Sequence, residues 1–230
     1  MKAHYIHPYK AYFPHQARGI IIGTAPAHRF CVREELKLLE GDIDFFYGSF
    51  HNRFWPVLKR VFEPESFSWL KTTRQCRDFL ARHNLAIGDT IAEFHREVHY
   101  AGDENLQMLT VNKSLIRRLA QNEQIAYAFF SSHEAFRLFR KAIRQELLYI
   151  IEAFAGNEMP GVKPKDILTM KLYDEAGHEY NKITLIILRS PSPRGVDDSA
   201  LLEDYQRKFA AFIDLERTEP RLLPETLVHD

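Results

Sequence analysis

The stretch GIIIG at residues 19–23, which runs into TAPAH at residues 24–28, decides the fold class of this chain. A short run of isoleucines with a glycine at each end is typical of a strand that is buried on both faces of a parallel sheet. Pro26 cannot continue a central strand, so we expect a loop directly after it. In open α/β sheets, ligands bind beside the loops that follow the carboxyl ends of such strands.

A second apolar run, ITLIIL at residues 183–188, ends in RSPSPRG at residues 189–195, where two prolines impose extended backbone. Such runs alternate with segments of helical periodicity, for example residues 73–82 and 134–155. This alternation predicts an α/β fold, a three-layer α/β/α sandwich with a short, mostly parallel central sheet. If the two apolar runs are neighbours in that sheet, their loops line one cleft.

The whole chain, residues 1–230, is expected to form a single domain with its core over residues 17–213. An irregular amino-terminal segment and an irregular carboxyl-terminal tail are expected to flank this core. Further strands are expected at residues 85–87, 125–130 and 167–173, and further helices at residues 32–39, around 55–62 and from 198 or 199 to about 212.

Composition excludes several classes of protein. The 230 residues include only two cysteines, Cys31 and Cys76, which exclude a disulfide-stapled scaffold and any four-cysteine metal or iron–sulfur site. No run approaches the roughly 20 apolar residues of a membrane helix. The first residues lack the apolar region of a secretory signal. We therefore expect a cytoplasmic protein without membrane association.

The formal charge is balanced, with 31 Lys and Arg against 31 Asp and Glu, but it is unevenly distributed. Residues 195–230 hold nine acidic and four basic side chains, which leaves 27 basic and 22 acidic ones in residues 1–194. A mildly basic body of this kind is compatible with weak nucleic-acid binding that falls with added salt.

Three segments in order resemble the uracil-DNA glycosylase superfamily: GIIIGTAPAH at residues 19–28, FFYGSFHNRFW at residues 45–55 and LIILRSPSPRG at residues 185–195. An aromatic residue followed shortly by NRFW is most similar to the hypoxanthine-DNA and mismatch-specific branches. The resemblance covers about residues 17–200, although residues 158–181 match no segment of the family.

The resemblance implies a monofunctional DNA glycosylase of base-excision repair. Such an enzyme flips a deaminated base (hypoxanthine, uracil or xanthine) out of the stack and excises it by water attack on the N-glycosidic bond. The implied partner is DNA that contains such bases, no cofactor is implied, and the protein is expected to be a monomer.

Asn52 is the residue that the resemblance implies for positioning the attacking water. The uracil branch instead carries an acidic residue before the proline of the first motif, and Ala25 stands at that place here. Thr24 is a second candidate, although a neutral hydroxyl is a poor base. The alternative for Asn52 is a cap on the helix that begins near Arg53, because asparagine is a favoured N-cap residue.

The resemblance also implies the residues that hold the base. Tyr47 would stack on the flipped base, and the backbone of Gly23, Thr24 and Ala25 would face the base or its leaving oxygen. Asp89, just past a strand, would accept a hydrogen bond from an N–H of the base. The alternatives are that Tyr47 belongs to the core and that Asp89 caps a helix from Thr90.

The serine–proline loop is implied to bind DNA. Its backbone amides and serine hydroxyls would hold phosphates, and the residues concerned are Ser190, Pro191, Ser192 and Pro193. Arg194 would wedge into the duplex, with a solvated turn residue as the alternative. Ser190 also falls where the uracil branch has a histidine that steadies the leaving base, which weakens the case for uracil.

No metal site is expected. His95 and His99 are four residues apart, but Arg96 stands where the zinc-protease motif needs glutamate. We expect three amino-terminal histidines to be surface residues: His4, His7 and His15.

Two other functions compete with the DNA glycosylase. A glycosylase for free nucleosides is disfavoured by Arg194 and the stiff serine–proline loop. A nucleic-acid-binding member of the superfamily with weak or no catalysis is favoured by Ala25 and Ser190, and opposed by Asn52.

Overall fold

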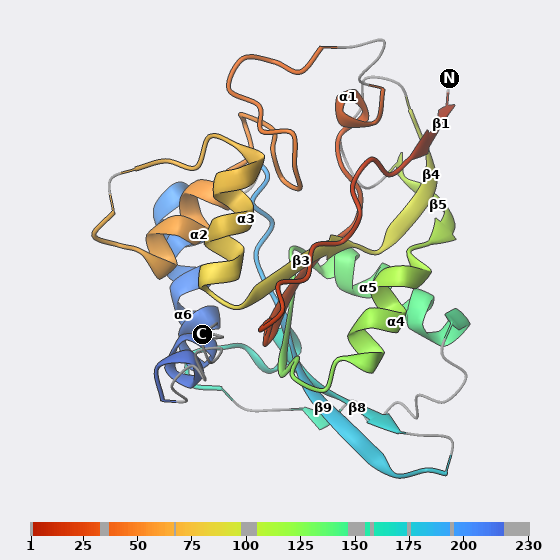
Figure 1. The fold of residues 1–230 in the computed structure, drawn as a ribbon, viewed down its shortest axis with the longest axis vertical. Helices are drawn as coiled ribbons and strands as arrows, with labels where there is room; N and C mark the ends of the chain where they lie inside the picture. The colour runs from red at the N-terminus through yellow and green to blue at the C-terminus, as the bar shows by residue number, and fades with distance from the viewer. Residues whose placement is uncertain are drawn as a thin grey trace, which may run out of the picture.

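The computed structural model has a central six-stranded sheet covered by helices on both faces (Figure 1). It describes residues 2–32, 37–66, 68–97, 105–146, 155–156, 159–173, 176–193 and 196–218. The strand order of this sheet is β3-β2-β6-β9-β8-β7. The α/β/α fold predicted from the sequence is therefore confirmed.

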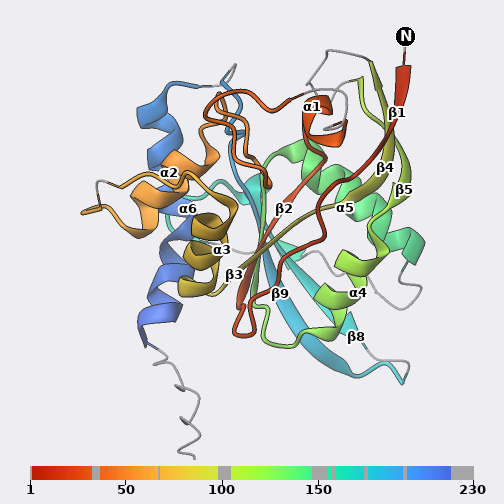
Figure 2. The ribbon, with the colours of Figure 1, turned by 45° about the horizontal axis from the view of Figure 1, so that its top comes forward.

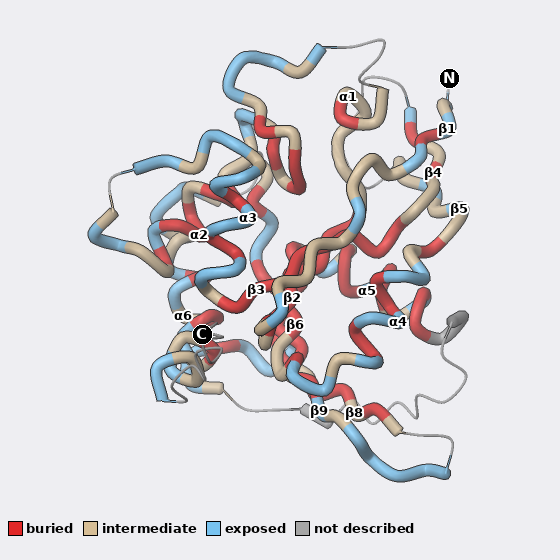
Figure 3. Tube along the Cα trace, viewed as in Figure 1, coloured by how far each residue is buried: buried red, intermediate tan, exposed pale blue. Residues whose placement is uncertain are grey.

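The central strands are parallel to one another. All five residues of β2 (Gly19–Gly23) are buried, and β2 pairs in parallel with β3 (Leu85–Asp89) on one side and β6 (Tyr127–Phe130) on the other. β6 in turn pairs in parallel with β9 (Glu179–Ile187). In Figure 3 the buried residues of these strands gather at the centre of the molecule, whereas β9 begins with exposed residues.

The far edge of the sheet is antiparallel. β8 (Ile167–Tyr173) pairs with β9 as the hairpin that the sequence predicts, and β7 (Ala155–Gly156) pairs with β8. The sheet is thus mostly parallel, and β8 starts at the edge where β9 ends.

Helices form two layers that sandwich the sheet (Figure 2). One layer contains α2 (Phe54–Phe62), α3 (Thr73–Arg82) and α6 (Asp198–Thr218), and the other contains α4 (Lys113–Gln121) and α5 (His133–Glu146). Ile21 points into the core under the first layer, whereas Ile20 and Ile22 belong to the core under the second. This alternation is the period of two that a strand imposes. None of the described helices is long and apolar enough to cross a membrane.

A second, three-stranded antiparallel sheet contains β1 (Lys2–Ile6), β4 (Ile91–Glu97) and β5 (Gln107–Val111). The expectation of an irregular amino-terminal segment is wrong for residues 2–6, because they pair with β4. Since β4 follows β3 almost directly, this pairing carries the chain after β1 to the carboxyl end of β3.

Three other expectations differ from the structure. β2 and β9 are not neighbours, because β6 lies between them. Residues 37–39 do not form the helix that was expected at residues 32–39. A short helix, α1 (His28–Cys31), lies just before that range instead. The helix expected at 134–155 is wrong at Ala155, which lies in β7. Residues 33–36, 147–154 and 219–230 lie outside the described part of the chain.

Candidate active site

Gly23 and Asp89 lie side by side where β2 and β3 end. They are register partners in the parallel pair. Beyond the strands, the N–H of Thr90 donates to the Gly23 carbonyl at 3.0 Å, and the N–H of Ile91 donates to the Thr24 carbonyl at 3.3 Å. The two chains therefore leave the sheet together, and Asp89 is fixed beside the first motif.

Tyr47 completes this group. A Cβ at position 23 would lie closer to the Asp89 carboxylate Oδ1 and the Tyr47 hydroxyl than any van der Waals contact allows. The two oxygens thus converge on the space that glycine leaves empty. Three residues that the resemblance implied for base binding, from three separate segments, come together at one edge of the sheet.

The backbone at Tyr47 has a left-handed conformation, with φ +54°. Bulky residues rarely adopt this conformation, and such strain is concentrated at functional sites. The Tyr47 ring stacks on Phe54, with centroids 4.1 Å apart and 23° between the planes. One face of the ring therefore belongs to the core, as the alternative proposed, while the residue as a whole is only half-buried.

An ion pair fixes the loop that carries Tyr47. Arg29, just past the first motif, donates from Nε to Asp42 Oδ2 at 2.7 Å and from a terminal nitrogen to Oδ1 at 3.0 Å, and it also reaches Ser49 Oγ at 2.7 Å. Burial alone would raise the pKa of Asp42, but the bonds from Arg29 and from the backbone N–H groups of Phe50 and Leu39 outweigh burial and lower it. The charged pair joins the first motif to the second.

Asn52 caps the start of α2 from one residue before the N-cap position, which is Arg53. Its Oδ1 accepts a hydrogen bond from the backbone N–H of Phe54, the first residue of α2, at 2.9 Å. The capping alternative is thus realised, although an amide oxygen has a second lone pair that can accept from water. The water-positioning role stays a prediction.

Arg53 ties the second motif to the serine–proline loop, a function that the sequence did not suggest. Its backbone N–H donates to the Pro191 carbonyl at 3.2 Å, and its guanidinium donates to the Ser192 carbonyl at 2.5 Å. The guanidinium also reaches the Val196 carbonyl at 2.5 Å and Asp198 Oδ1 at 3.0 Å. Arg53 therefore holds the loop on both sides of Arg194, which itself lies outside the described residues.

His7 is the other site residue that the sequence analysis missed. Its Nε2 lies 2.9 Å from Asp89 Oδ2, and the two side chains are only 4% and 7% exposed. The expectation of a surface residue is wrong here, because β1 delivers this side chain to the end of β3. Tyr9 N–H donates to His7 Nδ1 at 3.1 Å, so Nδ1 is the acceptor and Nε2–H donates to the carboxylate.

The structure also decides the alternative that was open for Asp89. Residues after Asp89 form β4 and not a helix, so the helix-capping alternative for Asp89 is wrong. Arg96, which breaks the zinc-protease pattern, is fully buried and donates to the Pro26 carbonyl at 2.5 Å. It therefore supports the loop of the first motif. Among the described residues, no three His, Cys, Asp or Glu side chains are grouped as a metal site requires.

Thr24 and Ala25 continue the first motif past Gly23. Thr24 is buried, and Ala25 is half-buried against the small core between the second sheet and the body of the molecule. Their backbone is thus held at the edge of the sheet near Asp89, and their roles toward a base or a water stay predictions.

No protein-family model matches the chain, and no curated protein matches its sequence. Among solved structures, the chain is similar to the solution NMR structure of a protein from Methanosarcina acetivorans described as a "putative Uracil DNA glycosylase". The TM-score is 0.50 at 14% sequence identity, over 94% of this chain and 99% of that chain. The likeness shows a shared fold over nearly the whole chain.

The buried pair between His7, just past β1, and Asp89, at the end of β3, should be stronger than the exposed His4–Glu93 pair between β1 and β4. Replacing His7 by Ala leaves a buried carboxylate without its donor, which costs about 1–3 kcal/mol of unfolding free energy. His4→Ala is the matched control, because its pair is 47% and 41% exposed, and it should change stability by less than about 0.5 kcal/mol. Urea denaturation at neutral pH measures both, and equal losses would contradict the assigned geometry.

Arg53→Ala should free the serine–proline loop. We expect faster limited cleavage by trypsin after Arg189 or Arg194 and a loss of about 1–3 kcal/mol in unfolding free energy, because the part-buried carbonyls of Ser192 and Val196 lose a charged donor. Arg60→Ala is the control, since Arg60 is an exposed cation on the same helix. If both variants are cleaved in this loop at the wild-type rate, Arg53 does not hold it.

Proposed function

We propose that this protein is a monofunctional DNA glycosylase that flips a deaminated base, hypoxanthine before uracil or xanthine, out of DNA and hydrolyses its N-glycosidic bond. One observation carries the proposal: Gly23, Tyr47 and Asp89 converge where β2 and β3 end. The shared fold with a protein described as a "putative Uracil DNA glycosylase" supports it.

The base would be held by stacking and by one charged acceptor. Tyr47 offers the ring face that Phe54 does not cover, and base–aromatic stacking contributes roughly 1–3 kcal/mol. Asp89 has Oδ2 engaged by His7 and Oδ1 directed toward Gly23, so Oδ1 would accept an N–H of hypoxanthine or uracil. His7 would keep that carboxylate in a single orientation.

Hydrolysis would use water held by neutral groups. Asn52, and more weakly Thr24, would orient the water by hydrogen bonds, since neither side chain takes a proton at neutral pH. The backbone of Gly23 and Ala25 would face the base as negative charge develops on it. An enzyme of this kind should turn over slowly, because no described group in the motifs is a strong general base beside the sugar.

A second candidate is a nucleic-acid-binding protein of the same fold with weak or no catalysis. Ala25 and Ser190 favour it, because they replace the acid and the histidine that the uracil branch uses. The cap made by Asn52 also favours it, since this bond gives the residue a structural reason to be present.

The first experiment separates these two functions. The protein is incubated with single-stranded and duplex oligonucleotides that carry hypoxanthine, xanthine or uracil, and abasic sites are then cleaved with alkali. Strand breaks at hypoxanthine support the proposal. Binding without breaks at any base would assign the second candidate, and neither binding nor breaks would overturn both.

Two variants of Asn52 separate its role toward water from its role as a cap. Asn52→Ala should lower the cleavage rate by at least about 100-fold and stability by about 1 kcal/mol, because both hydrogen bonds are lost. Asn52→Asp caps the helix equally well, so it should keep wild-type stability and substantial cleavage. If Asn52→Ala cleaves at the wild-type rate per folded molecule, the water is held elsewhere.

A further inference from the structure

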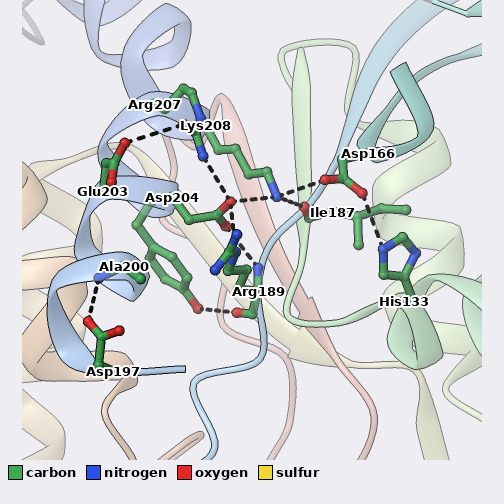
Figure 4. A network of polar contacts seen from close by, with 11 residues as sticks. His133, Asp166, Ile187, Arg189, Asp197, Ala200, Glu203, Asp204, Arg207 and Lys208 are labelled. Carbon is green, nitrogen blue, oxygen red and sulfur yellow. Dashed lines mark hydrogen bonds and ion pairs between the residues drawn. The ribbon is translucent and has the colours of Figure 1, made fainter. Parts of the chain in front are cut away.

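A cavity of about 450 Å³ lies at the same edge of the sheet as the candidate active site, near the ends of β6 and β9. Its walls come from the start of α5, the segment that precedes β8, the end of β9 and α6 (Figure 4). Ser190 of the serine–proline loop also lines it, whereas Gly23, Tyr47 and Asp89 do not. This cavity is therefore separate from the site proposed for the base.

The floor of the cavity is a buried ion cluster. Lys208 Nζ lies 3.1 Å from Asp204 Oδ1 and 3.3 Å from Asp166 Oδ2, and it donates to the Ile187 carbonyl at 2.6 Å. The lysine is 3% exposed and the carboxylates are 4% and 12% exposed. A buried cluster with this many partners is rigid, so it can hold the groups around it in place.

Two guanidinium groups are held above this floor. Arg189 Nε and a terminal nitrogen of Arg207 each lie 3.5 Å from Asp204 Oδ1, and the N–H of Arg189 donates to Asp204 Oδ2 at 3.0 Å. Arg207 also lies 3.6 Å from the exposed Glu203. Both arginine side chains stay partly exposed, at 41% and 35%, and face the cavity.

Lys163 and Lys165 complete a positive rim. Both are exposed, and neither makes an ion pair with any residue that the structure describes. The lining thus holds five cationic side chains against two carboxylates, besides His133, whose Nε2 lies 3.2 Å from Asp166. The surplus of positive charge indicates an anionic ligand.

The segment that supplies these lysines is built against Arg207. Gly161 has φ +75°, and a Cβ there would lie 2.6 Å from Arg207 Cδ, so the backbone closes directly on the arginine. This segment belongs to residues 158–181, for which the sequence alone shows no resemblance to the glycosylase superfamily. The lysines therefore lie in a part of the chain to which the motifs of the resemblance assign no role.

The position of the cavity fits a DNA strand that crosses from the base site. β9 is the second strand from β2, and strands lie about 4.8 Å apart, so the cavity lies on the order of 10 Å from Gly23 across the sheet. Phosphates follow at about 3.4 Å of rise per nucleotide on one strand. A distance of about 10 Å therefore places the cavity within reach of backbone phosphates close to the flipped nucleotide.

We infer that the cavity binds backbone phosphates of the DNA strand that carries the damaged base, with Lys163, Lys165, Arg189 and Arg207 as the contacts. This inference rests on the proposed function. Arginine and lysine at such a site fix the register of the protein on the strand and do not read its sequence. These contacts would lengthen the DNA footprint beyond the serine–proline loop.

The test compares the double variant Lys163→Ala/Lys165→Ala with wild type and with Lys141→Ala/Lys182→Ala. The control removes the same charge from exposed lysines that do not line the cavity. Binding to a hypoxanthine duplex is measured by fluorescence anisotropy from 50 to 200 mM salt. The first variant should bind about tenfold more weakly at 100 mM salt. The slope of its log binding constant against log salt concentration should be shallower by about 1.8, because each of the two lost phosphate contacts contributes about 0.9. The control should match wild type.

Three other outcomes would overturn the inference, and each of them points to a different explanation. Wild-type affinity and slope in the first variant, with cleavage of hypoxanthine intact, would remove the phosphate site and leave the proposed function standing. No duplex binding by wild type would overturn both. Titration with inorganic phosphate is the third arm: saturable binding that the first variant loses, together with an unchanged duplex slope, would assign the cavity to a small phosphate ligand.

Discussion

Residue 23 has to be glycine because the Tyr47 hydroxyl and the Asp89 carboxylate occupy the place of its side chain. This close approach requires three segments to be positioned at once. The parallel register of β2 and β3 brings Asp89 beside Gly23, and the left-handed backbone at residue 47 turns the tyrosine toward both. The rest of the site is arranged to keep these groups in place.

Two arginines do most of that positioning. Arg29 binds the buried Asp42 and so joins the first motif to the loop of Tyr47, while Arg53 binds carbonyls on both sides of Arg194 and joins the second motif to the third. The three motifs are thus connected through charged hydrogen bonds to fixed acceptors, which are stronger than neutral ones. The three motifs, which are far apart along the chain, thus lie together at one edge of the sheet.

Much of the fold could be predicted because its signals are local. The buried strand at Gly19–Gly23 and the helix at Thr73–Arg82 follow from apolar runs, periodicity and punctuation by glycine and proline. The order of the strands could not be predicted, because β6 is as apolar as its neighbours and nothing local says which pair meets. The same limit applies to His7 and Asp89, whose contact spans 82 residues and depends on the pairing of β1 with β4.

The site residues divide in the same way. The resemblance pointed to Gly23, Tyr47 and Asp89, and the structure brings them together, whereas Asn52 turned out to have a capping bond that the residue type alone also allowed. A crystal structure with a duplex that carries a non-hydrolysable hypoxanthine nucleotide tests the central claim most directly. We expect an extruded base on the Tyr47 face opposite Phe54, with its N–H bonded to Asp89. A base that stays in the helix, or that lies in the cavity beside Ser190, would contradict it.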